Sequence, residues 1–146
     1  MENTSTLSSA IGNPSVKFSG AGNTKEKKIY GLELVLELFD CDLEKLTSIG
    51  RVEEFLDKLE KEGGLTRYGA PLIKRFMGGG HFGEGYSFLQ FLSSSSISGH
   101  YIEPDRIAFI NVFSCSMFDH KKVTQFCTKY FDAKKVKATP IIHKDI

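Results

Sequence analysis

The 146-residue chain has no tryptophan, almost no net charge and no pair of cysteines at CxxC spacing. Its 19 basic and 18 acidic residues leave a formal charge of +1, so the charge balance does not favour a nucleic acid or an anionic membrane as a partner. An odd number of cysteines, 3, favours free thiols over a disulfide framework. We therefore expect a cytoplasmic protein.

The chain also lacks any apolar run near the ~20 residues that span a bilayer. Its first residues contain no basic stretch followed by an apolar stretch, so we expect no secretory signal peptide. The glycine-rich segment Gly78–Gly85 lacks the Lys-Ser/Thr ending of a phosphate-binding loop. What is present, 40% hydrophobic and 25% charged residues, is typical of one soluble globular domain.

Residues 1–28 differ in composition from the rest of the chain. They are rich in Ser, Asn, Gly and Thr and contain few bulky apolar residues. Such a segment buries too little surface to offset its ordering entropy, so we expect a flexible tail followed by a single domain at residues 29–146.

Alternating leucines between Tyr30 and Cys41 predict the first strand of that domain. Its second face mixes Glu, Val and Phe, so we expect a partner subunit or a ligand to cover that face. Strands are also predicted at residues 65–77, 86–93, 107–115 and 135–142. Pro140 places the last of these at a sheet edge or ends it.

Two segments have apolar residues at helical spacing, and each follows an aspartate that can cap a helix, Asp42 or Asp119. The first helix is expected to end at Gly63-Gly64, with a break near Gly50. The residues expected on the two buried faces are Leu46, Ile49, Val52, Phe55, Leu56 and Leu59, then Val123, Phe126, Cys127, Tyr130 and Phe131. The order β-α-β-β-β-α-β predicts an α+β fold, a two-layer sandwich with two helices on one face of a mainly antiparallel sheet.

The most unusual stretch is the run of serines from Ser93 to Ser96, which continues as Ile97-Ser98-Gly99-His100. It lies between two apolar segments, where a linker or a buried strand would have a different composition. A serine hydroxyl beside a strained peptide bond can attack that bond, and a nearby histidine can move the proton. A solvated turn is the commoner interpretation of such a run, and the residues alone leave both open.

Three motifs accompany the run: Gly85-Tyr86-Ser87, Ile97-Ser98-Gly99-His100, and Ile110-Asn111-Val112-Phe113-Ser114-Cys115. Together they resemble the prokaryotic S-adenosylmethionine decarboxylase proenzymes, short self-cleaving enzymes of spermidine synthesis. In that family the reacting serine lies five residues before the histidine and twenty before the cysteine, which selects Ser95. The resemblance extends over residues 30–142.

The resemblance implies autocatalytic cleavage between Ser94 and Ser95. This gives a β chain of residues 1–94 and an α chain of residues 95–146. Ser95 becomes a covalent pyruvoyl group, which forms a Schiff base with the amine of the substrate, S-adenosylmethionine, and no metal is needed.

The resemblance also implies roles for three further side chains. His100 and Ser87, the latter eight residues before Ser95, take part in processing. Cys115 donates a proton during turnover. The family works as homodimers of cleaved protomers with sites between the subunits, in agreement with the uncovered face of the first strand.

Two segments depart from the family. Ser94 stands where Glu is usual, and Tyr101–Pro104 stands where many members have an aromatic-acidic segment. In its place Phe82 could stack on the adenine and Glu103 could bind the ribose hydroxyls. Because some relatives of the fold decarboxylate arginine or ornithine, a pyruvoyl-dependent decarboxylase of a basic amino acid is one alternative. An uncleaved homologue that regulates a catalytic partner is another.

Overall fold

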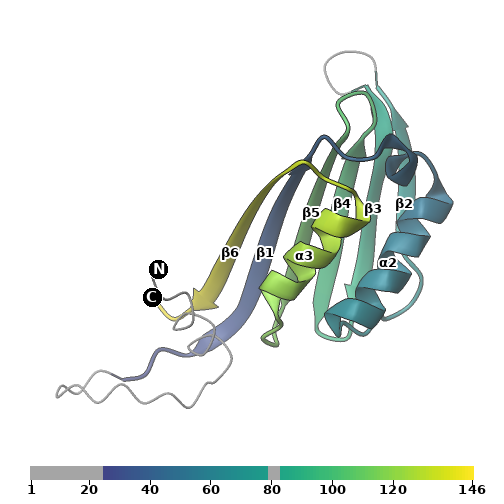
Figure 1. Ribbon diagram of the computed structural model, residues 1–146. Helices are drawn as coiled ribbons and strands as arrows, with labels where there is room; N and C mark the ends of the chain where they lie inside the picture. The colour runs from purple at the N-terminus through teal and green to yellow at the C-terminus, as the bar shows by residue number, and fades with distance from the viewer. Residues whose placement is uncertain (1–24, 79–82) are drawn as a thin grey trace, which may run out of the picture.

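The computed structural model of the protein describes residues 25–78 and 83–146, which form one sheet covered on one face by helices (Figure 1). The six strands are β1 (Ile29–Phe39), β2 (Leu72–Met77), β3 (Glu84–Leu92), β4 (Ser95–Ile102), β5 (Ile107–Ser114) and β6 (Lys135–Lys144). Their order is β2-β3-β4-β5-β1-β6, and every neighbouring pair is antiparallel. The predicted α+β sandwich is confirmed. The expected tail lies mostly outside the described residues.

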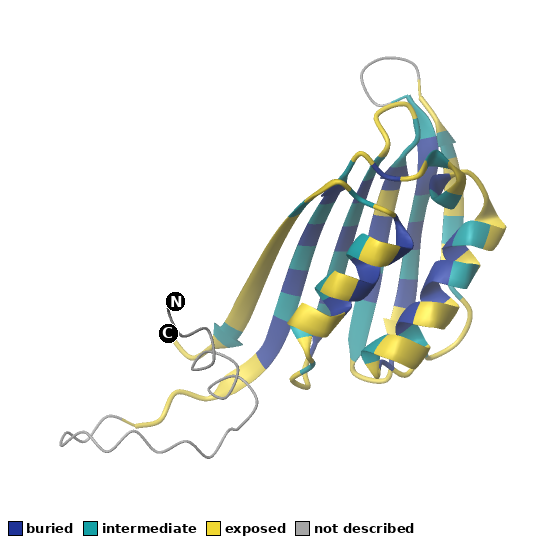
Figure 2. Cartoon of the chain, viewed as in Figure 1, coloured by how far each residue is buried: buried dark blue, intermediate teal, exposed yellow. Residues whose placement is uncertain are grey.

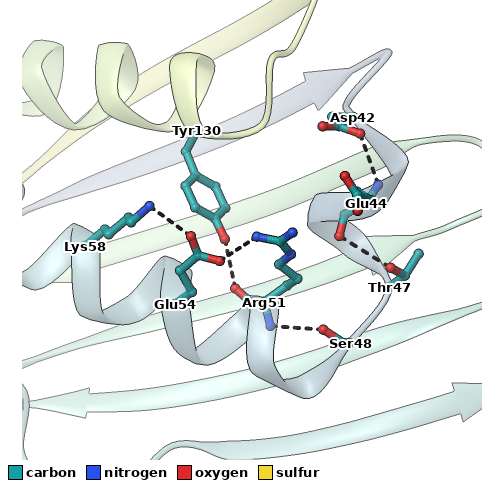
Figure 3. Close-up of polar contacts among 8 residues, drawn as sticks. All are labelled: Asp42, Glu44, Thr47, Ser48, Arg51, Glu54, Lys58 and Tyr130. Atoms are coloured by element: carbon teal, nitrogen blue, oxygen red, sulfur yellow. Dashed lines mark hydrogen bonds and ion pairs between the residues drawn. The ribbon is translucent and has the colours of Figure 1, made fainter.

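The helices are the 3-10 helix η1 (Leu43–Leu46), α2 (Ile49–Gly63) and α3 (His120–Tyr130). Asp42 caps η1, and the longer helix α2 has its own cap, Ser48, whose hydroxyl accepts a hydrogen bond from the Arg51 N–H (Figure 3). The break therefore lies at Thr47 and Ser48, just before the expected Gly50. The expectation that Asp42 caps the long helix was wrong, because the single turn of η1 lies between Asp42 and α2.

The other helix ends agree with the predictions. The helix α2 ends at Gly63, and its C-cap, Gly64, adopts the left-handed conformation with φ of 67°. The Asp119 carboxylate caps α3 by accepting from the Lys122 N–H at 3.0 Å. The expectation that Ile49 is buried was wrong, since its side chain is 50% exposed. Ile49 is the first residue of α2, and the buried face of the helix begins one turn later, at Val52.

The core lies between the helices and the inner face of the sheet, where Figure 2 shows buried residues alternating along the strands. The alternating leucines of β1 all face the helices: Leu32, Leu34, Leu36 and Leu38 are each at most 1% exposed. Phe55 of α2 lies at the centre of an aromatic cluster, with ring centroids 5.0 Å from Phe131 and 5.4 Å from Tyr130. The Tyr130 hydroxyl also donates to the Arg51 carbonyl at 3.0 Å, which joins α3 to α2 (Figure 3).

The strand β4 was not predicted, because the serine run obscured it. Only Ser93 and Ser94 form the turn after β3, and Ser95 already pairs with Leu92. The inward positions of β4 hold a glycine, Gly99, where the pattern would need a bulky residue. The ring of Phe88 fills that space: a Cβ at position 99 would lie 2.2 Å from it.

The strand β2 is shorter than expected, and residues 65–71 are irregular apart from a single bridge between Arg67 and Leu92. Gly69 in this segment has φ of 75°, which a strand does not allow. The buried amide of Gln90 donates to the Gly69 carbonyl at 3.0 Å and fixes the segment to β3. The prediction that β6 lies at an edge is confirmed.

Candidate active site

The predicted cleavage site lies at one end of the sheet, in the segment Ser93–Ser95, which we call the cleavage turn. Ser95 is the first residue of β4, and its partner across the sheet is Ser114, the last residue of β5. The Ser95 hydroxyl donates to the Ser114 hydroxyl with an Oγ–Oγ distance of 2.8 Å. Ser114 is only 4% exposed, so both hydroxyls lie on the helix side of the sheet, at the rim of the core.

The carbonyl that would be attacked already has a donor. The Cys115 N–H donates to the Ser94 carbonyl oxygen at 3.4 Å. A backbone N–H in this position stabilises the negative charge that develops when a nucleophile adds to the carbonyl. The distance is long for a hydrogen bond, so the contact has room to tighten as the charge develops. One chain thus places a candidate nucleophile, the Ser95 hydroxyl, and a candidate oxyanion donor, the Cys115 N–H, at the cleavage turn.

A pocket of about 150 Å³ opens at the cleavage turn. Its walls are the loop after α2, the cleavage turn itself, and the residues around the end of β5: Gly64, Leu65, Thr66, Leu92, Ser93, Ser94, Ser95, Ser114 and Ser116. Pockets that enclose a whole small-molecule ligand have volumes of roughly 300–1,000 Å³. The walls that one chain provides here are therefore too few to enclose a nucleoside-sized substrate.

Cys115 is the one cysteine of the three that is exposed. Burial raises the pKa of the Cys41 thiol to about 11, and burial also raises the pKa of Cys127. Those two thiols stay protonated inside the core. Cys115 follows β5 directly and contacts the cleavage turn through its backbone N–H, so it is the exposed cysteine beside that turn.

Ser87 and His100 form a second group, on the sheet face that points away from α2 and α3, which we call the open face. They are direct partners across β3 and β4, and the Ser87 Oγ lies 2.8 Å from the His100 Nδ1. His100 is exposed. It lies five residues along β4 from Ser95, roughly 16 Å at 3.3 Å per residue, and on the opposite face. Transfer of a Ser95 proton to His100 within one chain is therefore not possible in this conformation.

The open face also carries a polar network that sequence reasoning missed. The Asn111 amide donates to one Glu33 carboxylate oxygen at 2.8 Å, and the His143 Nε2 lies 2.9 Å from the other. Both contacts hold the pKa of Glu33 below its ordinary value, and the hydrogen bond from Asn111 has the larger effect. The three residues come from β5, β1 and β6, so only Asn111, a polar residue in an apolar strand, signalled the network in the sequence.

Beside the network, the open face has a pocket of about 280 Å³. It is lined by Val35, Leu36, Ser98, His100, Phe109, Ile110 and Asn111. His100 therefore borders an apolar hollow on the face for which the sequence predicted a partner or ligand.

Of the two predicted substrate-binding residues, only Glu103 lies among the described residues. Phe82 lies outside the described residues. The Glu103 carboxylate forms an ion pair with Arg75 on β2, with Nη1–Oε1 at 2.6 Å, and a second Arg75 nitrogen bonds Glu84 at 2.9 Å. In this structure the Glu103 carboxylate is therefore paired with Arg75, and its predicted contact with the ribose hydroxyls stays a prediction.

Within residues 25–78 and 83–146, no three His, Cys, Asp or Glu side chains are grouped so that they could hold a metal ion. No helix in these residues is long and apolar enough to cross a membrane.

The sequence is similar to proteins of one family. The family model described as S-adenosylmethionine decarboxylase matches residues 32–143. The S-adenosylmethionine decarboxylase proenzymes of Clostridium botulinum strains Langeland and Okra are 28% identical over 120 residues, which cover 82% of this chain and 98% of theirs.

A solved structure has the same fold. The crystal structure of the adenosylmethionine decarboxylase from Aquifex aeolicus superimposes with a TM-score of 0.68 at 19% sequence identity, covering 82% of this chain and 94% of that one. At this identity the likeness bears on the fold alone, and it agrees with the two-layer α+β sandwich.

Proposed function

The chain belongs to the S-adenosylmethionine decarboxylase family, and we propose that it decarboxylates S-adenosylmethionine to the aminopropyl donor of spermidine synthesis. The observation that carries this proposal is the family match over residues 32–143, which includes α2, α3 and every strand except the first three residues of β1 and the last of β6. The reaction breaks a carbon–carbon bond and releases CO2, so the enzyme is a carboxy-lyase. No comparison favours the arginine or ornithine substrates or a regulatory role without cleavage.

The proposed chemistry begins with self-cleavage between Ser94 and Ser95. The Ser95 Oγ adds to the Ser94 carbonyl carbon and the peptide C–N bond breaks, so the amide becomes an ester and the hydroxyl proton ends on the freed nitrogen. Loss of the Ser95 α-proton then expels the Ser94 carboxylate and leaves dehydroalanine. Tautomerisation, addition of water and loss of ammonia leave a pyruvoyl group at the start of the α chain, residues 95–146.

The residues around Ser95 fit such a group. Ser95 begins a strand directly after a turn, so a new chain end there leaves the rest of the β4 ladder paired. Its neighbours in the pocket are mostly small and polar, which leaves room for a planar carbonyl group. When formed, the pyruvoyl carbonyl supplies the electron sink that decarboxylation of an amino acid requires. Cys115 is the residue that we expect to return a proton to the substrate carbon.

We further propose that a second copy of the chain covers the open face, as a homodimer with shared sites. The position of the Ser87–His100 pair supports this proposal, because the pair lies away from the cleavage turn of its own chain. The hollow beside His100 and the half-buried Glu33 network are features of a face that becomes covered. In a homodimer with shared sites, His100 of one copy would have to reach the cleavage turn of the other around the end of the sheet, where Ser95 lies at the rim of the core.

Intact-mass measurement and a decarboxylation assay test the proposal together. The purified protein should consist of two chains, residues 1–94 and 95–146, and the shorter should begin with a ketone that cyanoborohydride reduces in the presence of an amine. It should release labelled CO2 from carboxyl-labelled S-adenosylmethionine, but not from arginine or ornithine. An uncleaved chain that releases no CO2 would overturn the proposal. Release from arginine or ornithine alone would reject the substrate and keep the chemistry.

A further inference from the structure

We propose that Ser114 is a positioning residue for self-cleavage, because its hydroxyl holds the Ser95 hydroxyl in place for attack on the Ser94 carbonyl. This inference rests on the proposed function, since it presumes that the bond between Ser94 and Ser95 is cleaved. It adds a residue to those already considered, and it explains why a polar side chain is buried at the end of an otherwise apolar strand face.

The first support is the contact itself. A serine side chain has three staggered rotamers, and only some of them bring the hydroxyl oxygen near the preceding carbonyl carbon. The 2.8 Å hydrogen bond to Ser114 selects one rotamer of Ser95. The conformational cost of placing the nucleophile is then met when the chain folds, not when it reacts.

The second support is that the Ser114 oxygen is itself fixed. The Ser116 N–H donates to the Ser114 Oγ at 3.1 Å, so this oxygen accepts one hydrogen bond from Ser95 and one from Ser116. Two donors and a side chain at 4% exposure leave the Ser114 hydroxyl little freedom. A serine hydroxyl is too weak a base to remove the proton at neutral pH, so the role that fits is positioning.

The third support is the packing of β1 against the same segment. A Cβ at Gly31 would lie 2.4 Å from the Ser114 carbonyl oxygen and 3.3 Å from the Cys115 Cα. The backbone of β1 therefore reaches the end of β5 only because residue 31 has no side chain. This approach fixes Ser114 together with Cys115, whose N–H contacts the Ser94 carbonyl. Ser114, which holds the Ser95 hydroxyl, and Cys115, whose N–H contacts the Ser94 carbonyl, are thus adjacent residues of one closely packed segment.

The test follows the first step of cleavage in freshly translated full-length chain, with intact mass recorded over time. Ser114→Ala and Ser114→Cys should both cleave about tenfold more slowly or worse, since alanine lacks the acceptor and the cysteine sulfur is a weak one of similar size. Ser114→Thr, which keeps the hydroxyl, should restore most of the rate. Ser96→Ala is the matched control, because this serine belongs to the same run but lies on the open face, and it should cleave at the wild-type rate.

Hydroxylamine separates positioning for attack from a role in the later elimination. It cleaves an ester at residue 95 but not an amide, so a variant that forms the ester and then stalls is cut quickly. The Ser114→Ala chain should show no such hydroxylamine-sensitive fraction. A large sensitive fraction would place Ser114 in the elimination step and overturn the inference.

The remaining outcomes are equally decisive. If Ser114→Cys cleaves at the rate of the Ser96→Ala control, the hydroxyl is not needed and the inference is wrong. If Ser114→Thr is as slow as Ser114→Ala, the hydroxyl is not the cause and the inference is again wrong. If the wild-type chain itself does not cleave, the proposed function fails, and the two failures are thus distinguished.

Discussion

The cleavage turn and the Ser87–His100 pair differ in how completely one chain builds them. At the cleavage turn, Ser95 has a buried hydrogen-bond partner and the Ser94 carbonyl has a donor, all from one chain. The Ser87–His100 pair is well formed, but it lies exposed on the open face and on the other side of the sheet from Ser95.

This difference indicates a division of labour. Placement of a nucleophile beside its own carbonyl is a local problem, which one hairpin and its neighbouring strand can solve. Proton transfer requires a titratable group within hydrogen-bond reach, and here the histidine reaches only Ser87. Under the proposed function, one folded chain would suffice to position the nucleophile, whereas the proton transfers would depend on a second copy over the open face.

The largest expected effect is at the nucleophile. Ser95→Ala should abolish cleavage, because no other hydroxyl can form the ester at this bond. A denaturing gel and intact mass should show one full-length chain. Ser93→Ala provides a control within the cleavage turn, since its hydroxyl is not the one held by Ser114, and it should leave two chains. Cleavage of the Ser95→Ala chain at the same bond would show that the reacting serine was chosen wrongly.

The next effect tests whether the two regions come from different copies. His100→Ala alone should slow cleavage by about 100-fold or more, the usual loss of a general acid–base group. Co-expressed with Ser95→Ala, the His100→Ala chain should be cleaved again, because the Ser95→Ala chain supplies an intact histidine. Chains that carry different tags report which one is cut. If co-expression leaves His100→Ala uncut, the site is not shared and the division between copies is refuted.

A smaller change to the cleavage turn should separate processing from turnover. Cys115→Ser keeps the backbone N–H that contacts Ser94, so cleavage should stay within about twofold of wild type. Decarboxylation should fall about 100-fold, since a serine hydroxyl is a much poorer proton donor than a thiol. Gel densitometry measures the first and labelled CO2 the second. Equal loss of both would mean that Cys115 acts through structure and not as a proton donor.

The smallest expected effect concerns the Glu33 network on the open face. Because hydrogen bonds to Asn111 and His143 lower the folded-state pKa of Glu33, the stabilisation is present above its ordinary value of 4.5 and is lost as the pH falls through the folded value. Glu33→Gln should lower the melting temperature by about 2–4 °C at pH 7. At pH 3 the difference from wild type should shrink. A difference that is constant with pH would show that the charge of Glu33 does not contribute.

Several elements could be predicted because their signal is local. The helix α3 follows from apolar residues at spacings that fit one helical face, and Val123 and Cys127 are fully buried as expected. The leucines of β1 alternate with the period of a strand, and the core accepts all of them on one side. The choice of Ser95 rests on the family resemblance, through its spacing to His100 and Cys115, and it stays a prediction.

The strand β4 could not be predicted for a physical reason. A strand is recognised in a sequence by apolar residues at every second position, but Gly99 occupies one of the inward positions of β4. The ring of Phe88, on the neighbouring strand, fills the space that a side chain at position 99 would take. The pattern is complete only when two strands are read together. The start of β2 was misjudged in a similar way, because a side chain from β3, Gln90, holds the irregular segment before it.

By itself the sequence determined the class of fold and the two helical faces, since both depend on residues close together in the chain. Only the tertiary structure decided that Ser95 meets Ser114, that His100 lies on the other face, and that Glu33 joins Asn111 to His143. These contacts depend on strand order and register. Both are set by the packing of the whole sheet against its helices, which no short stretch of sequence records.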